Sequence, residues 1–322
     1  MIDDRFVKML DGQLSDDESR NLLSSMRGLP VTGEMLAQAA SLLRDRMTTI
    51  EYPEPLLDTC GTGGDHQCTL NISTAAAFVV AGAGVKVAKH GNRSVSSSSG
   101  SSDVLNILGV HTDIPSEGVK ACLDEAGIGF CFAPRFHPRL RAMAPIRKQL
   151  GFPTIFNLLG PLCNPAMVQR QVMGIGSREY LRPMAEALLS LGVERAAVVH
   201  GDPRLDEVSL QGATQVFLIS DGTIREMSWS PSDFGFEPQS IESIRCSDAS
   251  ESADQIKRIL QNESVPGLPW VLANAAASLH VTHPEKTLSE CVQWSQEVVR
   301  SGRAYRALQL LQLVSQKYLS SS

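Results

Sequence analysis

The chain has 322 residues, of which 43% are hydrophobic and 20% are charged, and its formal net charge at pH 7 is -6. This composition is typical of a soluble globular protein that can bury a large core. The acidic balance argues against a general nucleic-acid binder, because neutralising the phosphates of a duplex requires a surplus of Lys and Arg on one face.

The distribution of apolar residues argues against two further classes of protein. No stretch approaches the ~20 uninterrupted apolar residues of a membrane span. Residues 1–12 are charged and lack the apolar segment and small-residue cleavage site of a secretory signal. We therefore expect a cytoplasmic protein that does not enter a membrane.

Two regions with different apolar patterns follow one another along the chain. Within the first fifty residues, apolar positions such as Leu22, Leu23 and Met26 recur at helical spacing and predict a small α-helical domain over residues 1–53. From Leu56 onward, short apolar runs alternate with glycine-marked turns and longer helical patterns. That alternation is typical of an α/β protein, so residues 54–322 are predicted to form a larger α/β domain.

Individual elements of the larger region follow from the same patterns. Strands are predicted at residues 85–88, 129–133, 172–175, 195–200 and 216–220. Helices are predicted over residues 74–83, 103–108, 116–126, 138–150, 178–191 and most of 249–316. Residues 94–102 form a serine-rich tract that, taken alone, fits a flexible linker.

The first candidate binding segment is a glycine cluster that follows an apolar run. It consists of Asp58, Thr59, Cys60, Gly61, Thr62, Gly63, Gly64 and Asp65. Asn71, Ser73 and Thr74 then lead into an alanine-rich helix, where they suit an N-cap and where backbone N–H groups can bind phosphate oxygens. A glycine cluster alone fits a tight turn equally well, and this one matches neither the dinucleotide fingerprint nor the P-loop.

The second candidate segment runs from Lys89 to Arg93 after the predicted strand at 85–88, and the serine tract follows it. A cation, an amide and several hydroxyls then lie at the end of a strand, where open α/β sheets bind ligands. Two phosphate-suited loops indicate a ligand with two separated phosphate groups. The alternative is that Lys89 and Arg93 are solvated charges and that the serines belong to a capped loop.

Adjacent carboxylates form the third candidate segment. Asp206 and Glu207 follow the predicted strand at 195–200 and supply hard oxygen ligands suited to Mg²⁺ that also contacts substrate phosphates. In isolation, such an acidic pair is usually solvated. The two phosphate-suited loops shift the interpretation toward a metal site.

A fourth candidate segment suits an aromatic or carboxylate ligand. His137 lies beside Pro138, and Arg147 precedes the run of residues 154–165 that contains Gly160 and Pro161. The planar guanidinium of Arg147 can pair with a carboxylate, and the prolines and glycine can shape a pocket around it. A structural role for His137 is the alternative, so no proton transfer is assigned to it.

Taken together, the motifs resemble the anthranilate phosphoribosyltransferase family in identity, order and spacing, over nearly the whole chain. The matching segments are 61–65, 71–74, 89–93, 136–138, 156–165 and 206–207. The resemblance implies a small α-helical domain, with a returning helical segment near residues 137–160, and a larger α/β domain with a central, mostly parallel sheet. That architecture belongs to the nucleoside phosphorylase and phosphoribosyltransferase class. A homodimer formed mainly through the helical domains is also implied.

The resemblance further implies the substrates, the metal and the residues that bind them. The donor, 5-phosphoribosyl 1-pyrophosphate, would contact Gly61, Thr62, Gly63, Gly64, Asp65, Asn71, Ser73, Thr74, Lys89, Ser97 and Ser99. The acceptor, anthranilate, would contact Gly61, Asn92, His137, Arg147 and Gly160. Mg²⁺ would lie near Ser73, Asp206 and Glu207.

The chemistry of such a transfer predicts an electrostatic role for Lys89. Pyrophosphate leaves from an anomeric carbon, so negative charge grows on the leaving group, and cations and N–H groups placed there lower the barrier. The attacking amine is neutral and can lose its proton after the bond forms. Neither a covalent nucleophile nor a strong general base is therefore expected.

Two positions depart from the family pattern. Arg204 stands where the family usually has glycine, two residues from Asp206, and His66 follows the glycine loop where glycine is frequent. Three alternative functions remain open at this stage. They are a pyrimidine nucleoside phosphorylase, a phosphoribosyltransferase with another aromatic acceptor, and a catalytically weak relative that binds nucleic acid or regulates a partner.

Overall fold

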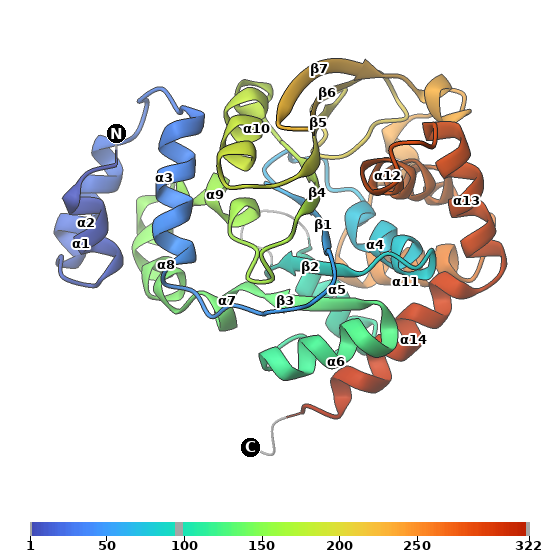
Figure 1. Cartoon of the computed structure of the whole chain (residues 1–322), viewed down its shortest axis with the longest axis horizontal. Coiled ribbons are helices and arrows are strands. Elements are labelled where there is room, and N and C mark those ends of the chain that lie inside the picture. Colours follow the sequence, from blue (N-terminus) through green and yellow to red (C-terminus); the bar gives the residue numbers. More distant parts are fainter. Residues whose placement is uncertain (1, 94–98, 320–322) are drawn as a thin grey trace.

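The computed structural model describes residues 2–93 and 99–319. Three helices come first, α1 (Asp4–Leu10), α2 (Asp16–Ser25) and α3 (Gly33–Arg44), and they lie together at one end of the molecule (Figure 1). Each begins after a residue whose side chain accepts a hydrogen bond from the first turn, namely Asp3, Ser15 and Thr32. The helical beginning expected from apolar spacing is therefore present.

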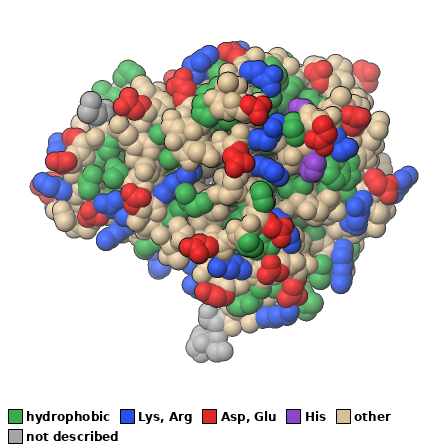
Figure 2. All heavy atoms as spheres, in the orientation of Figure 1, with side chains coloured by type: hydrophobic (Ala, Val, Ile, Leu, Met, Phe, Trp, Pro, Cys, Tyr) green, Lys and Arg blue, Asp and Glu red, His purple; other side chains and the backbone are tan. Residues whose placement is uncertain are grey.

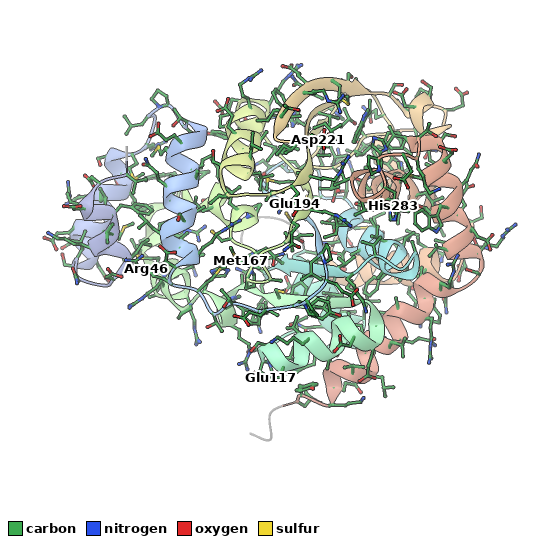
Figure 3. All side chains as sticks on the ribbon, in the orientation of Figure 1. Arg46, Glu117, Met167, Glu194, Asp221 and His283 are labelled. Atoms are coloured by element: carbon green, nitrogen blue, oxygen red, sulfur yellow. The ribbon has the colours of Figure 1, made fainter. Side chains whose placement is uncertain are left out.

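Arg46 connects two of these helices. Its Nε and Nη2 donate to the two carboxylate oxygens of Asp11, just after α1, at 2.7 and 3.1 Å, while its Nη1 donates to the carbonyl of Leu42 at 2.9 Å. Figure 3 labels Arg46 at the foot of α3. The ends of α1 and α3 are thus held together by one guanidinium.

Among the described residues, seven strands form a single sheet in the order β3-β2-β1-β4-β5-β6-β7. In chain order they are β1 (Leu57–Gly61), β2 (Val87–Gly91), β3 (Ile128–Phe132), β4 (Arg170–Gly174), β5 (Arg195–Gly201), β6 (Thr214–Ser220) and β7 (Thr223–Trp229). The first five strands of that order run parallel, and β6 and β7 are antiparallel. The expected mostly parallel sheet is confirmed, and β1 and β7 are additional to the predicted strands.

Helices cover both faces of this sheet (Figure 1). After α3 they are α4 (Ile72–Gly82), α5 (Ser101–Ile107), α6 (Ser116–Ala126), α7 (Ala133–Phe136), α8 (Pro138–Leu150), α9 (Phe156–Leu159), α10 (Leu181–Ser190), α11 (Ala249–Leu260), α12 (Gly267–Thr282), α13 (Leu288–Arg300) and α14 (Arg303–Gln316). The predicted helices at 116–126 and 138–150 have the bounds of α6 and α8. The one predicted at 178–191 begins as a 3₁₀ turn before α10.

The two sides of the sheet contribute to separate hydrophobic cores. On β5, Ala197 and Val199 belong to the core that contains α4 and α12, whereas Ala196 and Val198 belong to the core that contains α3 and α10. This follows from the two-residue period of a strand, which sends alternate side chains to opposite faces. Buried on both faces, β5 reads as a continuous apolar run.

The surface shows no large area of one charge on the face in Figure 2, where acidic and basic side chains are interspersed. Of the helices in residues 2–93 and 99–319, none combines the length and apolar character needed to cross a bilayer.

Candidate functional site

The glycine loop begins where β1 ends, at Gly61. A Cβ on Gly61 would overlap the carboxylate of Asp206, and Gly63 and Gly64 have φ values of 67° and 80°, which favour glycine. The backbone N–H of Thr62 donates to the carbonyl of Gly174 at 2.9 Å, so the loop starts against the end of the neighbouring strand β4. The three glycines are therefore required by close approach or by backbone conformation.

Asp206 and Glu207 lie against this loop, beyond the end of β5. The N–H of Gly63 donates to Asp206 Oδ2 at 2.8 Å, and the N–H of Ser73 donates to Glu207 Oε1 at 2.9 Å. The backbone N–H of Asp206 also approaches Asp65 Oδ2 at 3.5 Å. Three carboxylates contributed by two separate segments thus converge.

Glycines on neighbouring strands make room for the acidic pair. A Cβ on Gly174 would overlap the carbonyl oxygen of Asp206, and a Cβ on Gly201 would lie 2.6 Å from the carbonyl oxygen of Glu207. Sequence reasoning missed both glycines, because only the three-dimensional path of residues 206–207 reveals the close approach.

The carboxylate cluster is short of positive charge. Burial, followed by the charges of Asp65 and Glu207, raises the pKa of Asp206 well above its usual range. Burial also raises the pKa of Glu207 to about 7, although Lys89 and the hydrogen bonds from Ser73 act in the opposite direction. A cation added beside these groups would stabilise their ionised forms.

Lys89 lies under the glycine loop and is 2% exposed. It was expected to follow the strand at 85–88, but it lies within β2, which extends to Gly91. Its Nζ donates to the carbonyl of Thr59 at 2.5 Å and to Ser73 Oγ at 3.2 Å. Burial lowers the pKa of Lys89, while the charges of Asp58 and Glu207 raise it.

The start of α4 differs from the expected capping arrangement. Asn71 occupies the N-cap position, but its side chain forms no capping bond and instead accepts from Ser99 Oγ at 2.7 Å and Ser252 Oγ at 2.8 Å. Ser73 and Thr74 lie inside the first turn, and Thr74 Oγ1 is buried without a hydrogen-bond partner in the described part of the chain. The N-cap position of Asn71 is therefore confirmed, but the side-chain capping bond is absent because Asn71 bonds to more distant segments. Ser97 lies outside the described residues.

Two buried histidines connect β2 to the segment around Gly160. His90 Nδ1 lies 3.2 Å from the carbonyl oxygen of Gly160, and the ring centroids of His90 and His137 are 5.1 Å apart. Burial lowers the pKa of His137 to about 4, and burial, followed by the charge of His137, lowers that of His90 well below its usual value. Both rings are therefore neutral near pH 7. Sequence reasoning quoted His90 within a motif but assigned it no role.

Arg147 and Asn92 lie further along the segments that carry His137 and His90. Arg147 is half-buried in α8, with its Cζ 5.6 Å from the ring centroid of Phe156, and burial lowers its pKa. It takes part in none of the ion pairs formed within residues 2–93 and 99–319. Asn92 is exposed just after β2, and its Oδ1 accepts from the N–H of Arg93 at 2.7 Å. No contact described in this structure joins either residue to the His90 and His137 pair.

The two departures from the family pattern have unusual backbone conformations. Arg204 has φ 112° and His66 has φ 59°, in the region that favours glycine. The conformation explains why glycine suits these positions. The Arg204 side chain is exposed and forms no hydrogen bond or ion pair with the described residues.

Comparisons with known proteins agree with this arrangement. Residues 53–305 match the model of the glycosyl transferase family, a/b domain. The anthranilate phosphoribosyltransferase of Xanthobacter autotrophicus is 41% identical over 312 residues, covering 97% of this chain and 91% of the relative. That of Symbiobacterium thermophilum is 43% identical over 305 residues, covering 94% of this chain and 89% of the relative.

Solved structures are similar over the same extent. The anthranilate phosphoribosyltransferase of Thermus thermophilus superposes with a TM-score of 0.89 at 38% identity, covering 97% of this chain and 93% of that one. The Saccharomyces cerevisiae enzyme, in complex with PRPP and Mg, superposes with a TM-score of 0.89 at 28% identity, covering 97% of this chain and 91% of that one. The chain therefore belongs to the anthranilate phosphoribosyltransferases, within the glycosyl transferase family.

Proposed function

We propose that the chain transfers the 5-phosphoribosyl group from 5-phosphoribosyl 1-pyrophosphate to the amino group of anthranilate. The products are N-(5-phosphoribosyl)anthranilate and pyrophosphate, in a step of tryptophan biosynthesis. One observation carries the proposal: the glycine loop, the start of α4, Lys89 and the acidic pair meet beyond adjacent parallel strands. The carboxyl ends of such strands are where open α/β sheets bind ligands.

The donor is proposed to bind along the glycine loop and the start of α4. These residues offer backbone N–H groups, hydroxyls and one ammonium, which suit phosphate and ribose oxygens. The proposed donor contacts are Gly61, Thr62, Gly63, Gly64, Asp65, Asn71, Ser73, Thr74, Lys89, Ser97 and Ser99. The hydrogen bond from Ser99 Oγ to Asn71 supports this set, because it brings Ser99 to the start of α4.

Mg²⁺ is proposed to bind near Ser73, Asp206 and Glu207. Carboxylate and hydroxyl oxygens are the ligands that Mg²⁺ prefers, and one or two carboxylates usually bind it together with substrate phosphates. The raised pKa values of Asp206 and Glu207 fit this assignment, because they reflect carboxylates that are buried and, secondarily, close to one another and to Asp65. When bound, Mg²⁺ would supply positive charge that stabilises the departing pyrophosphate.

The protein's own residues would promote the transfer by holding charges and substrates in position. Lys89 is held by Thr59 and Ser73, and we propose that its charge lies where negative charge grows on the leaving group. His137 is buried and its depressed pKa keeps it neutral, so it would not repel the positive charge that develops on the ribose ring in the transition state. Catalysis would then require neither a covalent nucleophile nor a strong general base.

Anthranilate is proposed to bind near Gly61, Asn92, His137, Arg147 and Gly160. Arg147 supports the assignment, because a half-buried guanidinium without a carboxylate partner in the described structure suits an anionic ligand. The contact of His90 with Gly160 and His137 supports a shared pocket wall.

We also propose a domain boundary, an oligomeric state and a cellular location for the protein. We place the domain boundary at residues 53–54, with the segment near 137–160 returning to the helical domain. The packing of α2 against α8 supports that return. We further propose a homodimer formed mainly through the helical domains, as the resemblance to the family implies, and a cytoplasmic location.

A turnover assay tests the proposal. Purified protein with Mg²⁺, anthranilate and 5-phosphoribosyl 1-pyrophosphate should consume anthranilate fluorescence and release pyrophosphate in equal amounts. A panel of other aromatic acids and bases serves as the control. Turnover with one of those acceptors and none with anthranilate would refute the acceptor, and no pyrophosphate release with any acceptor would refute the transfer itself.

A further inference from the structure

A buried amide, Asn164, lies behind the proposed site. Its side chain is 2% exposed, and its Nδ2 donates to Asp58 Oδ2 and to the carbonyl of Ala88, each at 2.8 Å. Its Oδ1 accepts from the N–H of Ala166 at 2.9 Å. Both N–H groups and the carbonyl are used, so only one orientation of the amide satisfies all three partners.

Asp58 is the matching group on β1. Its carboxylate is 0% exposed, and its Oδ1 accepts from the N–H of His90 at 3.1 Å while Oδ2 accepts from Asn164. A buried carboxylate requires such hydrogen bonds to offset the loss of water. The strands β1 and β2 and the segment of residues 156–165 therefore meet at these two side chains.

The segment 156–165 has two further attachments to the sheet. The carbonyl of Gly160 faces His90 on β2, and the carbonyl of Pro161 accepts from Gln171 Nε2 on β4 at 2.8 Å. Asn164 is where the same segment bonds to β1 and β2 together. Its loss would remove two hydrogen bonds from one end of the segment and leave the Asp58 oxygen unsatisfied.

Different hydrogen bonds hold the donor side and the acceptor side of the proposed site in place. The donor side has its own restraints, because the N–H of Gly63 bonds to Asp206 and that of Ser73 bonds to Glu207. The segment 156–165 belongs to the acceptor side, since it carries Gly160. Slackening it would move acceptor contacts and leave the restraints on the donor loop in place.

We infer that Asn164, oriented by Asp58, is a positioning residue that fixes the acceptor side of the site against the strands that carry the donor side. The inference rests on the proposed function. Asn164 acts through Gly160 and His90 and is not assigned any contact with substrate.

The first test compares Asn164→Ala with a matched control, Asn157→Ala. Asn157 lies in the same segment, but it is exposed and its Oδ1 only accepts from the N–H of Thr154 at 3.0 Å. We expect Asn164→Ala to raise the KM for anthranilate about tenfold and to change the KM for the donor less than about twofold. Asn157→Ala should leave both KM values near those of the unmodified protein.

A second variant, Asp58→Asn, approaches the same contact from the other side. Whichever way the new amide is turned, its NH₂ group faces an N–H of either His90 or Asn164. It should also raise the KM for anthranilate, and this rise should not add to that of Asn164→Ala, because both changes break one contact. Its donor KM is not used as a test, because the variant also removes the Asp58 charge that acts on Lys89. Asn164→Ser, with a smaller polar side chain, gives the same readout if the alanine variant does not fold.

Two results would overturn the inference. In Asn164→Ala, one is a donor KM that rises as much as the anthranilate KM, and the other is a lowered melting temperature with both KM values unchanged. Measurements on the unmodified protein distinguish the two hypotheses. If it shows no turnover, the proposed function is refuted. If it turns over but Asn164→Ala raises both KM values equally, only the role of Asn164 is refuted.

Discussion

Replacing Gly176 by alanine should damage the donor site without adding or removing any polar group. A Cβ at this position would lie 2.6 Å from the carbonyl oxygen of Gly63, 3.2 Å from the N–H nitrogen of Asp65 and 3.3 Å from the carbonyl carbon of Gly64. Real Cβ atoms essentially never approach other atoms closer than 3.0 Å. The 2.6 Å contact with Gly63 must therefore lengthen by at least 0.4 Å, through movement of the glycine loop or of β4.

The size of the effect follows from how catalysis depends on placement. A misplacement of about 1 Å can cost about a hundredfold in rate, so a displacement of roughly half that size should lower kcat/KM for the donor about tenfold. Overpacking should also destabilise the fold by about 1–3 kcal/mol. The anthranilate KM, measured at saturating donor, should change much less than the donor kcat/KM.

Steady-state kinetics with each substrate varied in turn, together with thermal unfolding, measure both effects. Gly222→Ala is the matched control, because Gly222 has φ 70° in the hairpin between β6 and β7 and has no atom within 4 Å of the added Cβ. It should lower the melting temperature and leave kcat/KM unchanged. A Gly176→Ala protein with wild-type donor kinetics would refute the reasoning that the rear of the loop is closely packed.

Four further predictions concern single side chains. Arg147→Ala should raise the anthranilate KM far more than the donor KM, because it removes the cation proposed to bind the carboxylate, and an equal rise in both would count against that role. Asp206→Asn should raise the Mg²⁺ concentration needed for half-maximal rate, and an unchanged Mg²⁺ titration would place the metal elsewhere. His137, with a folded pKa of about 4 against an ordinary value of 6.5, should destabilise the protein as the pH falls from 6.5 to 4. The stability lost should reach about 3 kcal/mol below pH 4, since a lowered pKa disfavours proton uptake by the folded state. Denaturant titrations at several pH values should show this loss diminished in His137→Gln, and identical pH profiles would contradict it. Arg204→Gly should raise the melting temperature by a few degrees, because relief of a positive φ worth about 1–2 kcal/mol exceeds the greater freedom of glycine in the unfolded chain. A lower melting temperature would mean that the exposed Arg204 side chain stabilises the fold.

The sequence predicted which segments come together at the site better than it predicted the individual strands and contacts. The glycine loop, the start of α4 and the acidic pair each follow a recognisable local pattern, and the parallel order of the strands brings their ends to one edge. β1 was missed as a strand because Asp58 and Thr59 interrupt its apolar pattern, and those polar groups are buried only because distant partners bond to them. β7 was missed because most of its residues are exposed.

Contacts between distant positions account for the remaining differences. The displaced capping role of Asn71 depends on Ser252, which lies 181 positions later in the chain. The need for glycine at 174 depends on the backbone path of Asp206. Neither constraint leaves a periodic or compositional signal in its own neighbourhood, so a single sequence cannot disclose it.

The hydrogen bonds from Gly63 and Ser73 to the acidic pair have a consequence for selectivity among anions in the cell. In this arrangement two internal carboxylates already occupy N–H groups suited to phosphate, so free inorganic phosphate must compete with anions that the protein itself supplies. A ligand that brings a divalent cation offers those carboxylates a better partner and releases the N–H groups at the same moment. The proposed donor site would therefore favour a metal-bound polyphosphate over free inorganic phosphate.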